Sequence, residues 1–148
     1  MSLKLSTGLR NKMLDTGSFK SIMDTCTLKI YSGTEPTTAD AALSGNTLLC
    51  EIFEDNDGVT TLTFNAAAAD GVIQKNSGET WEGTNAASGT ATFYRLELSS
   101  DTQGSSTTEA RVQGSIGLSG AELNLTNTAL LSAATQKIDY YSIALPTL

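Results

Sequence analysis

Carboxylates beside an aromatic ring are the first residues of this 148-residue chain that could do chemistry. Glu79 and Glu82 flank Trp81, the single tryptophan, and a carboxylate pair beside a sugar-stacking ring is typical of glycosidases. Residues three apart in a strand point to opposite faces of the sheet, which disfavours joint action of these two carboxylates. A lone tryptophan in a small β-domain more often anchors a core or an interface, and we predict that role for Trp81.

The remaining sequence motifs also argue against catalysis. The chain contains no histidine, which removes Ser-His and Cys-His catalysis and histidine-based zinc sites. The acidic run 54–58 lacks the spacing of an EF-hand loop and is predicted to be a solvated hairpin tip. Gly114, Gly117 and Gly120 are followed by no Lys-Ser/Thr pair, which argues against a phosphate-binding loop. We expect a non-enzymatic protein with no metal and no cofactor.

Cys26 and Cys50 are the only two cysteines. The sequence shows no leader pattern, so we expect synthesis in a bacterial cytoplasm, where two cysteines are more often free and buried than bridged. A disulfide between them remains the alternative. The chain has no run of 18 apolar residues, and a membrane span is not expected.

Charge divides the chain into a basic end and an acidic body. Residues 1–30 carry five basic groups against two acids, a net charge of +3, while the remaining 118 residues carry four against fourteen, a net charge of −10. An acidic body repels nucleic acid and anionic lipid, so we expect neither as a partner. The basic end either docks on an acidic protein surface, including a neighbouring copy, or is a solvated helical start.

The first 24 residues have the spacing of helices. Apolar residues recur at three- and four-residue intervals at Leu5, Leu9 and Met13, and then at Phe19, Ile22 and Met23. Gly17 and Ser18 supply a stop and an N-cap between the two sets. We predict a helical arm over residues 1–24, whose apolar stripe packs on the β-domain or on another subunit. The candidate interaction residues are Leu9, Arg10, Lys12, Met13, Phe19 and Lys20 in the arm, together with Trp81.

From residue 25 onward the apolar period becomes two, which is typical of strands. We predict an antiparallel β-sandwich or jelly-roll-like domain over residues 25–148. Its expected strands are 27–31, 47–53, 59–64, 71–75, 93–98, 110–116, 123–125 and 137–145. The second and third should form a hairpin, because Asp57-Gly58 is a strong turn signal.

The sequence also predicts which segments are exposed to solvent. The strands at 93–98 and 110–116 should be half-buried, with Arg95, Glu97 and Arg111 on the side opposite Tyr94 and the apolar residues. The polar loop 99–108 should project into solvent.

If residues 1–24 are a separate arm, a chain without them should retain a folded body that no longer joins particles.

Several short strings along the chain carry a family resemblance. They lie at residues 9–11, 30–34, 38–42, 81–83, 89–95, 113–114, 123–125 and 135–141. Through these strings the chain resembles a family of small proteins of tailed bacteriophages and prophages, commonly linked to head genes. The resemblance implies a virion structural protein and no catalytic residues.

Three roles are compatible with these observations. The first is a capsid decoration or cement protein that binds the major capsid protein and forms a homo-oligomer, with a trimer favoured. The second is a tail or head-to-tail connector component that binds other virion proteins. The third is a carbohydrate-binding β-sandwich that uses Trp81, Tyr94, Tyr140 or Tyr141 as stacking platforms.

Overall fold

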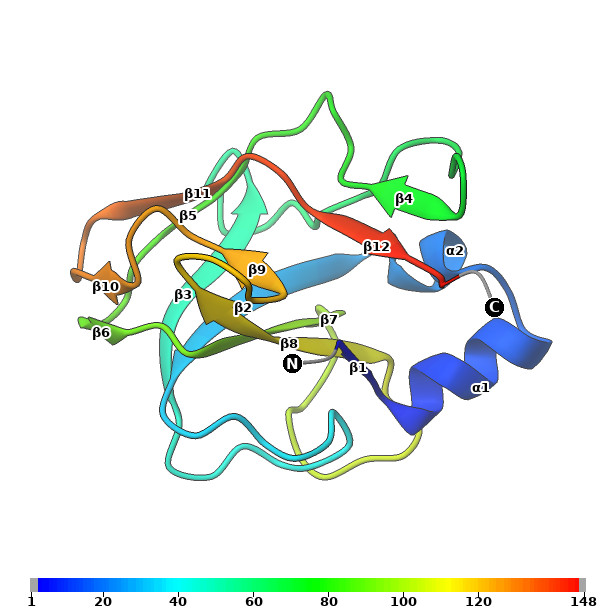
Figure 1. The fold of residues 1–148 in the computed structure, drawn as a ribbon, viewed down its shortest axis with the longest axis horizontal. Coiled ribbons are helices and arrows are strands. Elements are labelled where there is room, and N and C mark those ends of the chain that lie inside the picture. The colour runs from blue at the N-terminus through cyan, green and yellow to red at the C-terminus, as the bar shows by residue number, and fades with distance from the viewer. Residues whose placement is uncertain (1–2, 147–148) are drawn as a thin grey trace.

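An eight-stranded sheet forms the centre of the molecule in the computed structural model, which describes residues 3–146 (Figure 1). In order across the sheet lie β1 (Lys4–Leu5), β8 (Arg111–Gly117), β7 (Phe93–Leu98), β2 (Cys26–Ser32), β3 (Thr47–Glu54), β5 (Trp81–Thr84) and β11 (Thr135–Ile138). These neighbours pair antiparallel, and β9 (Leu123–Asn124) joins β8 in parallel. Two small sheets join β4 (Val72–Gln74) to β12 (Ser142–Ala144) and β6 (Gly89–Thr90) to β10 (Ala129–Leu130). The predicted mainly antiparallel β class is confirmed.

Two short helices lie between β1 and β2 in the chain, α1 (Thr7–Asp15) and α2 (Phe19–Met23). The predicted cap is confirmed, because the Ser18 hydroxyl oxygen accepts a hydrogen bond from the Ser21 N–H at 3.1 Å. Gly17 N–H donates to the Lys12 carbonyl at 2.9 Å, which closes the end of α1. The helices therefore meet at a tight corner over residues 16–18.

One face of the large sheet is apolar and fully covered. Alternate residues of the central strands, including Leu28, Ile30, Leu96 and Val112, have no exposed surface. Both helices, the β4–β12 sheet and the chain around Phe64 supply the side chains that complete this core. The large sheet and these smaller elements therefore share one hydrophobic core.

The N-terminal helices belong to that core. Leu9 and Met23 are 0% exposed and Phe19 is 8% exposed, all within the same cluster as the sheet residues. Backbone pairing adds to this contact, because Leu5 of β1 lies opposite Val112 of β8. Of the two predicted alternatives for the apolar stripe, packing on the chain's own β-domain is the one observed. We consequently no longer expect residues 25–148 to fold without residues 1–24.

Aromatic rings cross the core in a chain of edge contacts. Phe19 contacts Phe64 at 5.3 Å between ring centroids, and Phe64 contacts Trp81 at 5.8 Å. Trp81 in turn lies 5.7 Å from Tyr141, which lies 5.8 Å from Tyr94. The two tyrosine hydroxyls hydrogen-bond to each other at 3.2 Å. These contacts tie α2 to both halves of the chain.

The opposite face of the sheet is polar, and it is buried as well. Arg95, Glu97, Arg111 and Gln113 have 0% exposed surface, so the predicted half-buried character of these strands is wrong. Two long loops, 33–46 and 99–108, lie against this face (Figure 1). The sequence pattern gives no sign of a covered polar face, because alternation looks the same whether water or a loop meets the polar side.

The loop 99–108 is held down instead of projecting into solvent, contrary to the prediction. Asp101 is 8% exposed and receives two hydrogen bonds from the Arg111 guanidinium, at 2.6 and 2.8 Å. Arg111 also donates to the Gly104 carbonyl at 2.8 Å, and the Ser106 N–H donates to the Asp40 carbonyl of the neighbouring loop at 2.9 Å. One buried arginine therefore fixes the loop.

Residues 59–64 do not form the predicted partner strand of a hairpin. β3 pairs with β2 and β5, and residues 59–64 make only single bridges, from Leu62 to Cys26 and from Phe64 to Lys75. The turn at 55–58 is present and exposed, as predicted. The turn signal was therefore correct, although its two flanking segments pair with other parts of the chain.

The predicted last strand, 137–145, is divided in two. β11 ends at Ile138 and β12 begins at Ser142. Between them the alternation breaks, because Tyr140 is 64% exposed while Tyr141 and Ile143 are buried. The expectation of one continuous strand over 137–145 is therefore wrong.

Candidate functional site

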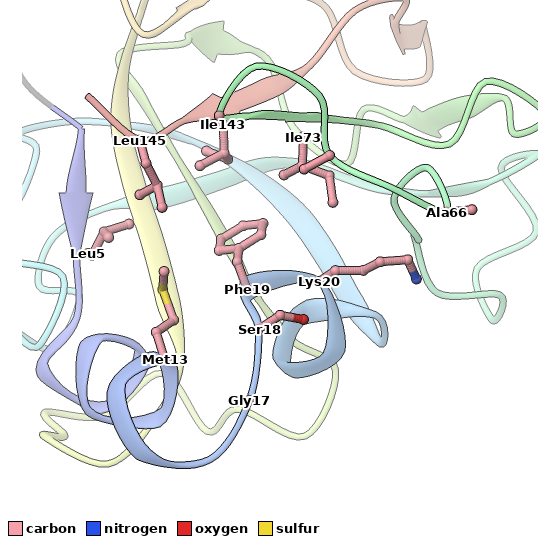
Figure 2. A pocket seen from close by; sticks show the side chains of 12 residues that line it. Leu5, Met13, Gly17, Ser18, Phe19, Lys20, Ala66, Ile73, Ile143 and Leu145 are labelled. Carbon is pink, nitrogen blue, oxygen red and sulfur yellow. The ribbon is translucent and has the colours of Figure 1, made fainter. Parts of the chain in front are cut away.

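An open apolar groove lies where both ends of the chain meet the core. It encloses about 470 Å³. Its walls come from β1, the α1–α2 corner, the segment 66–71, β4 and β12 (Figure 2). The residues that line it are Leu5, Met13, Gly17, Ser18, Phe19, Lys20, Ala66, Ala68, Gly71, Ile73, Ile143 and Leu145.

The corner between the helices shapes this groove. Because the chain turns at Gly17 and Ser18, Met13 from α1 and Phe19 from α2 point to the same hollow (Figure 2). The Phe19 ring lies at its centre, below Ile143 and Ile73 in the view. Phe19 is 8% exposed and is held by the edge contact with Phe64, so the groove has a preformed floor.

Apolar side chains continue from the groove onto the surface. Leu145 lines the groove and is 57% exposed, and Leu14, next to Met13, is 86% exposed. Accessible apolar side chains gathered around one groove are typical of contact sites, whereas single exposed apolar residues such as Leu14 are normal. The groove is therefore the strongest candidate for an interaction site.

Basic side chains border the groove on the helical side. Lys20 lines it and extends along its edge toward Ala66 (Figure 2), and its amino group pairs with Asp24. Arg10 and Lys12 lie on α1, one turn or less before Met13, and Arg10 is exposed. The groove thus has an apolar floor and one lining lysine, and the exposed Arg10 lies on the same side of α1 as the lining residue Met13, three residues away.

No family model, curated protein or solved structure matches this chain. The site is therefore interpreted from its own residues.

Three of the candidate interaction residues from the sequence are among the residues that line this groove. Met13, Phe19 and Lys20 line the groove, Arg10 and Lys12 flank it on α1, and Leu9 lies fully buried in the core. Sequence reasoning missed the opposite wall, formed by Leu5, Ala66, Ala68, Ile73, Ile143 and Leu145. These come from four separate segments, and a strand pattern does not show which apolar residues remain accessible.

Trp81 lies far inside the molecule. It has 0% exposed surface, and its indole N–H donates to a carboxylate oxygen of Glu79 at 2.8 Å. Glu79 also accepts from the Thr63 N–H at 3.0 Å. Of the two predicted anchor roles, the core role fits this position, since a fully buried ring offers no surface to a partner. Hydrogen bonds to the core therefore occupy the Glu79 carboxylate.

The aromatic residues do not form an exposed stacking platform. Trp81, Tyr94 and Tyr141 are at most 3% exposed, and of the four candidates only Tyr140 reaches the surface. A second hollow of about 380 Å³ beside β11 is lined by polar and small residues such as Asn85 and Gln136, with no aromatic among its lining residues. The arrangement lacks the coplanar exposed rings that a sugar-binding site needs.

The thiols offer no nucleophile. Cys26 and Cys50 are both free and buried, as predicted. Burial raises the pKa of Cys26 strongly and the pKa of Cys50 to about 12, so both remain protonated at neutral pH. Within residues 3–146, no group of three or more His, Cys, Asp or Glu side chains is arranged to hold a metal ion. None of the helices in this same part of the chain has the length and apolar character of a membrane span.

The buried charged residues under the loops 33–46 and 99–108 form a polar cluster away from the groove. Glu97 accepts from Lys29 at 2.7 Å, and burial raises the pKa of Glu97 despite this bond and the lysine charge. Burial also disfavours charged Asp101, but hydrogen bonds from Arg111 and Gln103 and the arginine charge outweigh it and lower the pKa of Asp101. These residues do not line the groove, and their contacts fix the loops. We therefore assign the cluster to structure.

Proposed function

We propose that this protein is a non-enzymatic structural component of a tailed-phage virion, most specifically a capsid decoration or cement protein. The observation that carries the proposal is the open apolar groove with a basic edge, set on an acidic body. Such a surface suits lasting contact with another protein. The residues that line it are mostly apolar and include no set of convergent catalytic groups.

The charge distribution supports the proposed partner class. An acidic body disfavours DNA and anionic lipid, whereas the basic helical corner suits an acidic protein surface. The major capsid protein or another virion protein is the partner we propose, with synthesis in the bacterial cytoplasm and residence in the virion. The family resemblance of the sequence supports the same role.

The proposal extends to fold and assembly. We interpret the large sheet and the β4–β12 sheet, which share one core, as a reduced sandwich or jelly-roll-like arrangement. A decoration protein binds many equivalent positions on a shell, where many modest contacts together give high avidity. We therefore propose a homo-oligomer, with a trimer as the form that suits three-fold positions.

Gel densitometry of purified particles tests the proposal directly. The amount of this protein is compared with that of the major capsid protein in particles obtained from the encoding phage or prophage. One copy for each capsid subunit, or for every three, supports decoration. A few copies per hundred subunits would place the protein in the tail or connector, and absence from the particle would refute a structural role.

A further inference from the structure

The turn after β3 carries a dense negative charge and an exposed apolar side chain. This acidic tip, residues 54–59, contains Glu54, Asp55 and Asp57, and Val59 at its end is 79% exposed. Among the described residues, none of these three carboxylates forms a salt bridge within the chain. The tip therefore presents unpaired negative charge next to an apolar group.

Hydrogen bonds hold the acidic tip in one shape. The Asp57 carboxylate accepts from the Val59 N–H at 2.8 Å and from the Thr60 N–H at 2.7 Å. The Asp55 N–H donates to the Thr80 carbonyl at 2.8 Å, and Asn56 donates to the Thr84 hydroxyl oxygen at 2.9 Å. A preorganised segment loses less conformational entropy on binding than a mobile one. The acidic tip can therefore bind another molecule without changing its conformation.

Carboxylate crowding at the tip gives a reason to seek a cation. Desolvation, and after it the negative charges of Glu79, Asp55 and Asp57, raise the pKa of Glu54. A positive group from another molecule would relieve this repulsion. The groove edge supplies such groups, since Arg10 and Lys12 form no salt bridge within the described part of the chain.

The groove and the acidic tip lie on different sides of the molecule. In Figure 1, β3 ends at the upper left of the view, whereas α1 and α2 lie at the right. Thr80 and Thr84, which hold the tip, are not groove residues. One molecule can therefore use both surfaces at once, each with a different neighbour.

We propose that the groove receives the acidic tip of a second copy of this chain. Val59 of one copy then contacts Met13 and Leu145 of the next, and the tip carboxylates face Arg10 and Lys12. The inference rests on the proposed assembly role and names the partner of the same groove. Because two different surfaces meet, the contact is head-to-tail, and it forms the proposed trimer when three such contacts close into a ring.

Two single substitutions test this contact through the mass of the purified protein in solution. Leu145→Glu places a carboxylate in the groove, and Val59→Lys places a positive charge on the tip. We expect the wild type to associate across a dilution series in light scattering. Each variant alone should associate about tenfold more weakly or worse, because a charge then enters an apolar contact and meets a like charge.

Mixing the two variants gives the decisive result. The Leu145→Glu protein keeps an intact tip, and the Val59→Lys protein keeps an intact groove. One contact can therefore form between the tip of the first and the groove of the second. We expect a 1:1 heterodimer and no larger species. A two-fold contact of groove against groove would not give this outcome, since Val59→Lys alone would then associate like the wild type.

Matched controls separate a contact effect from a general effect of charge. Leu118→Glu and Leu131→Lys introduce the same charges at leucines that are 65% and 68% exposed and lie outside the groove and the tip. They should associate like the wild type. Added salt should weaken the wild-type contact, because the facing charges are solvent-accessible.

A wild type that remains monomeric, variants that associate normally, or a mixture without heterodimer would each overturn the inference. Particle densitometry is independent of these measurements. A protein that is present in particles but monomeric in solution would refute the head-to-tail contact alone. A protein that forms rings but is absent from particles would refute the virion role alone.

Discussion

Replacing Asp101 with asparagine leaves the buried Arg111 guanidinium without its counter-ion. Both side chains are 0% exposed, and they are joined by two hydrogen bonds of 2.6 and 2.8 Å. Removing one partner of such a pair costs about 3–5 kcal/mol, because an uncompensated charge stays buried. Arg111 would keep its hydrogen bonds to the carbonyls of Ala39 and Gly104, at 3.2 and 2.8 Å, which places the expected loss near the lower limit.

We therefore expect Asp101→Asn to lower the free energy of unfolding by about 3 kcal/mol, a large part of the ~5–15 kcal/mol typical of a domain. At about 2–4 °C per kcal/mol for a chain of this size, the melting temperature should fall by roughly 6–12 °C. The sign of the pH effect follows from the lowered pKa of Asp101. The pair stabilises the protein above the unfolded-state pKa of about 3.9, and this contribution disappears as pH falls through the folded-state pKa.

Urea unfolding followed by circular dichroism measures this loss. Asp139→Asn is the matched control, because the Lys137–Asp139 pair is 3.4 Å long with side chains 55% and 81% exposed. It should cost no more than about 1 kcal/mol. A loss below about 1 kcal/mol for Asp101→Asn, with unchanged cooperativity, would refute the view that this pair holds the loop 99–108 on the sheet.

Three further predictions concern the core and the second buried acid. Trp81→Ala should cost about 3–5 kcal/mol in urea unfolding, because the variant empties a fully buried site, and retained stability would contradict the core assignment. A chain without residues 1–24 should give the spectrum of an unfolded protein, since Leu9 and Met23 leave the core; a cooperative melt would contradict this. Glu97 has a raised pKa and binds its proton more readily when folded, so the wild type should gain stability relative to Glu97→Gln as pH falls from 7 toward its pKa. A stability difference that is constant over pH, measured by urea unfolding, would show that Glu97 is not perturbed.

Local signals in the sequence were sufficient to predict the helices and the central strands. They were not sufficient to predict which other segments cover each face. Ser18 capped α2 as predicted, and period-two alternation located β2, β7 and β8. The same alternation placed Arg95 and Arg111 on a solvent face, because it cannot show that loops 33–46 and 99–108 return over that face. Burial of those arginines depends on long-range contacts with Ala41 and Asp101.

The candidate site was predictable only where one continuous segment supplies it. Helical spacing brought Met13, Phe19 and Lys20 together, and the charge division placed positive groups beside them. The other wall depends on β12 pairing with β4, two strands separated by almost seventy residues. No local pattern specifies that pairing, so Ile143 and Leu145 could not be assigned to the groove.

The groove is complete only after the chain has been synthesised through β12, because residues from distant segments line its two walls. Leu5, Met13 and Phe19 are synthesised well before Ile143 and Leu145. A chain interrupted before β12 lacks one wall of the groove and leaves Phe19 partly uncovered. Under the proposed role, an assembly step that uses this groove would therefore discriminate against prematurely terminated copies.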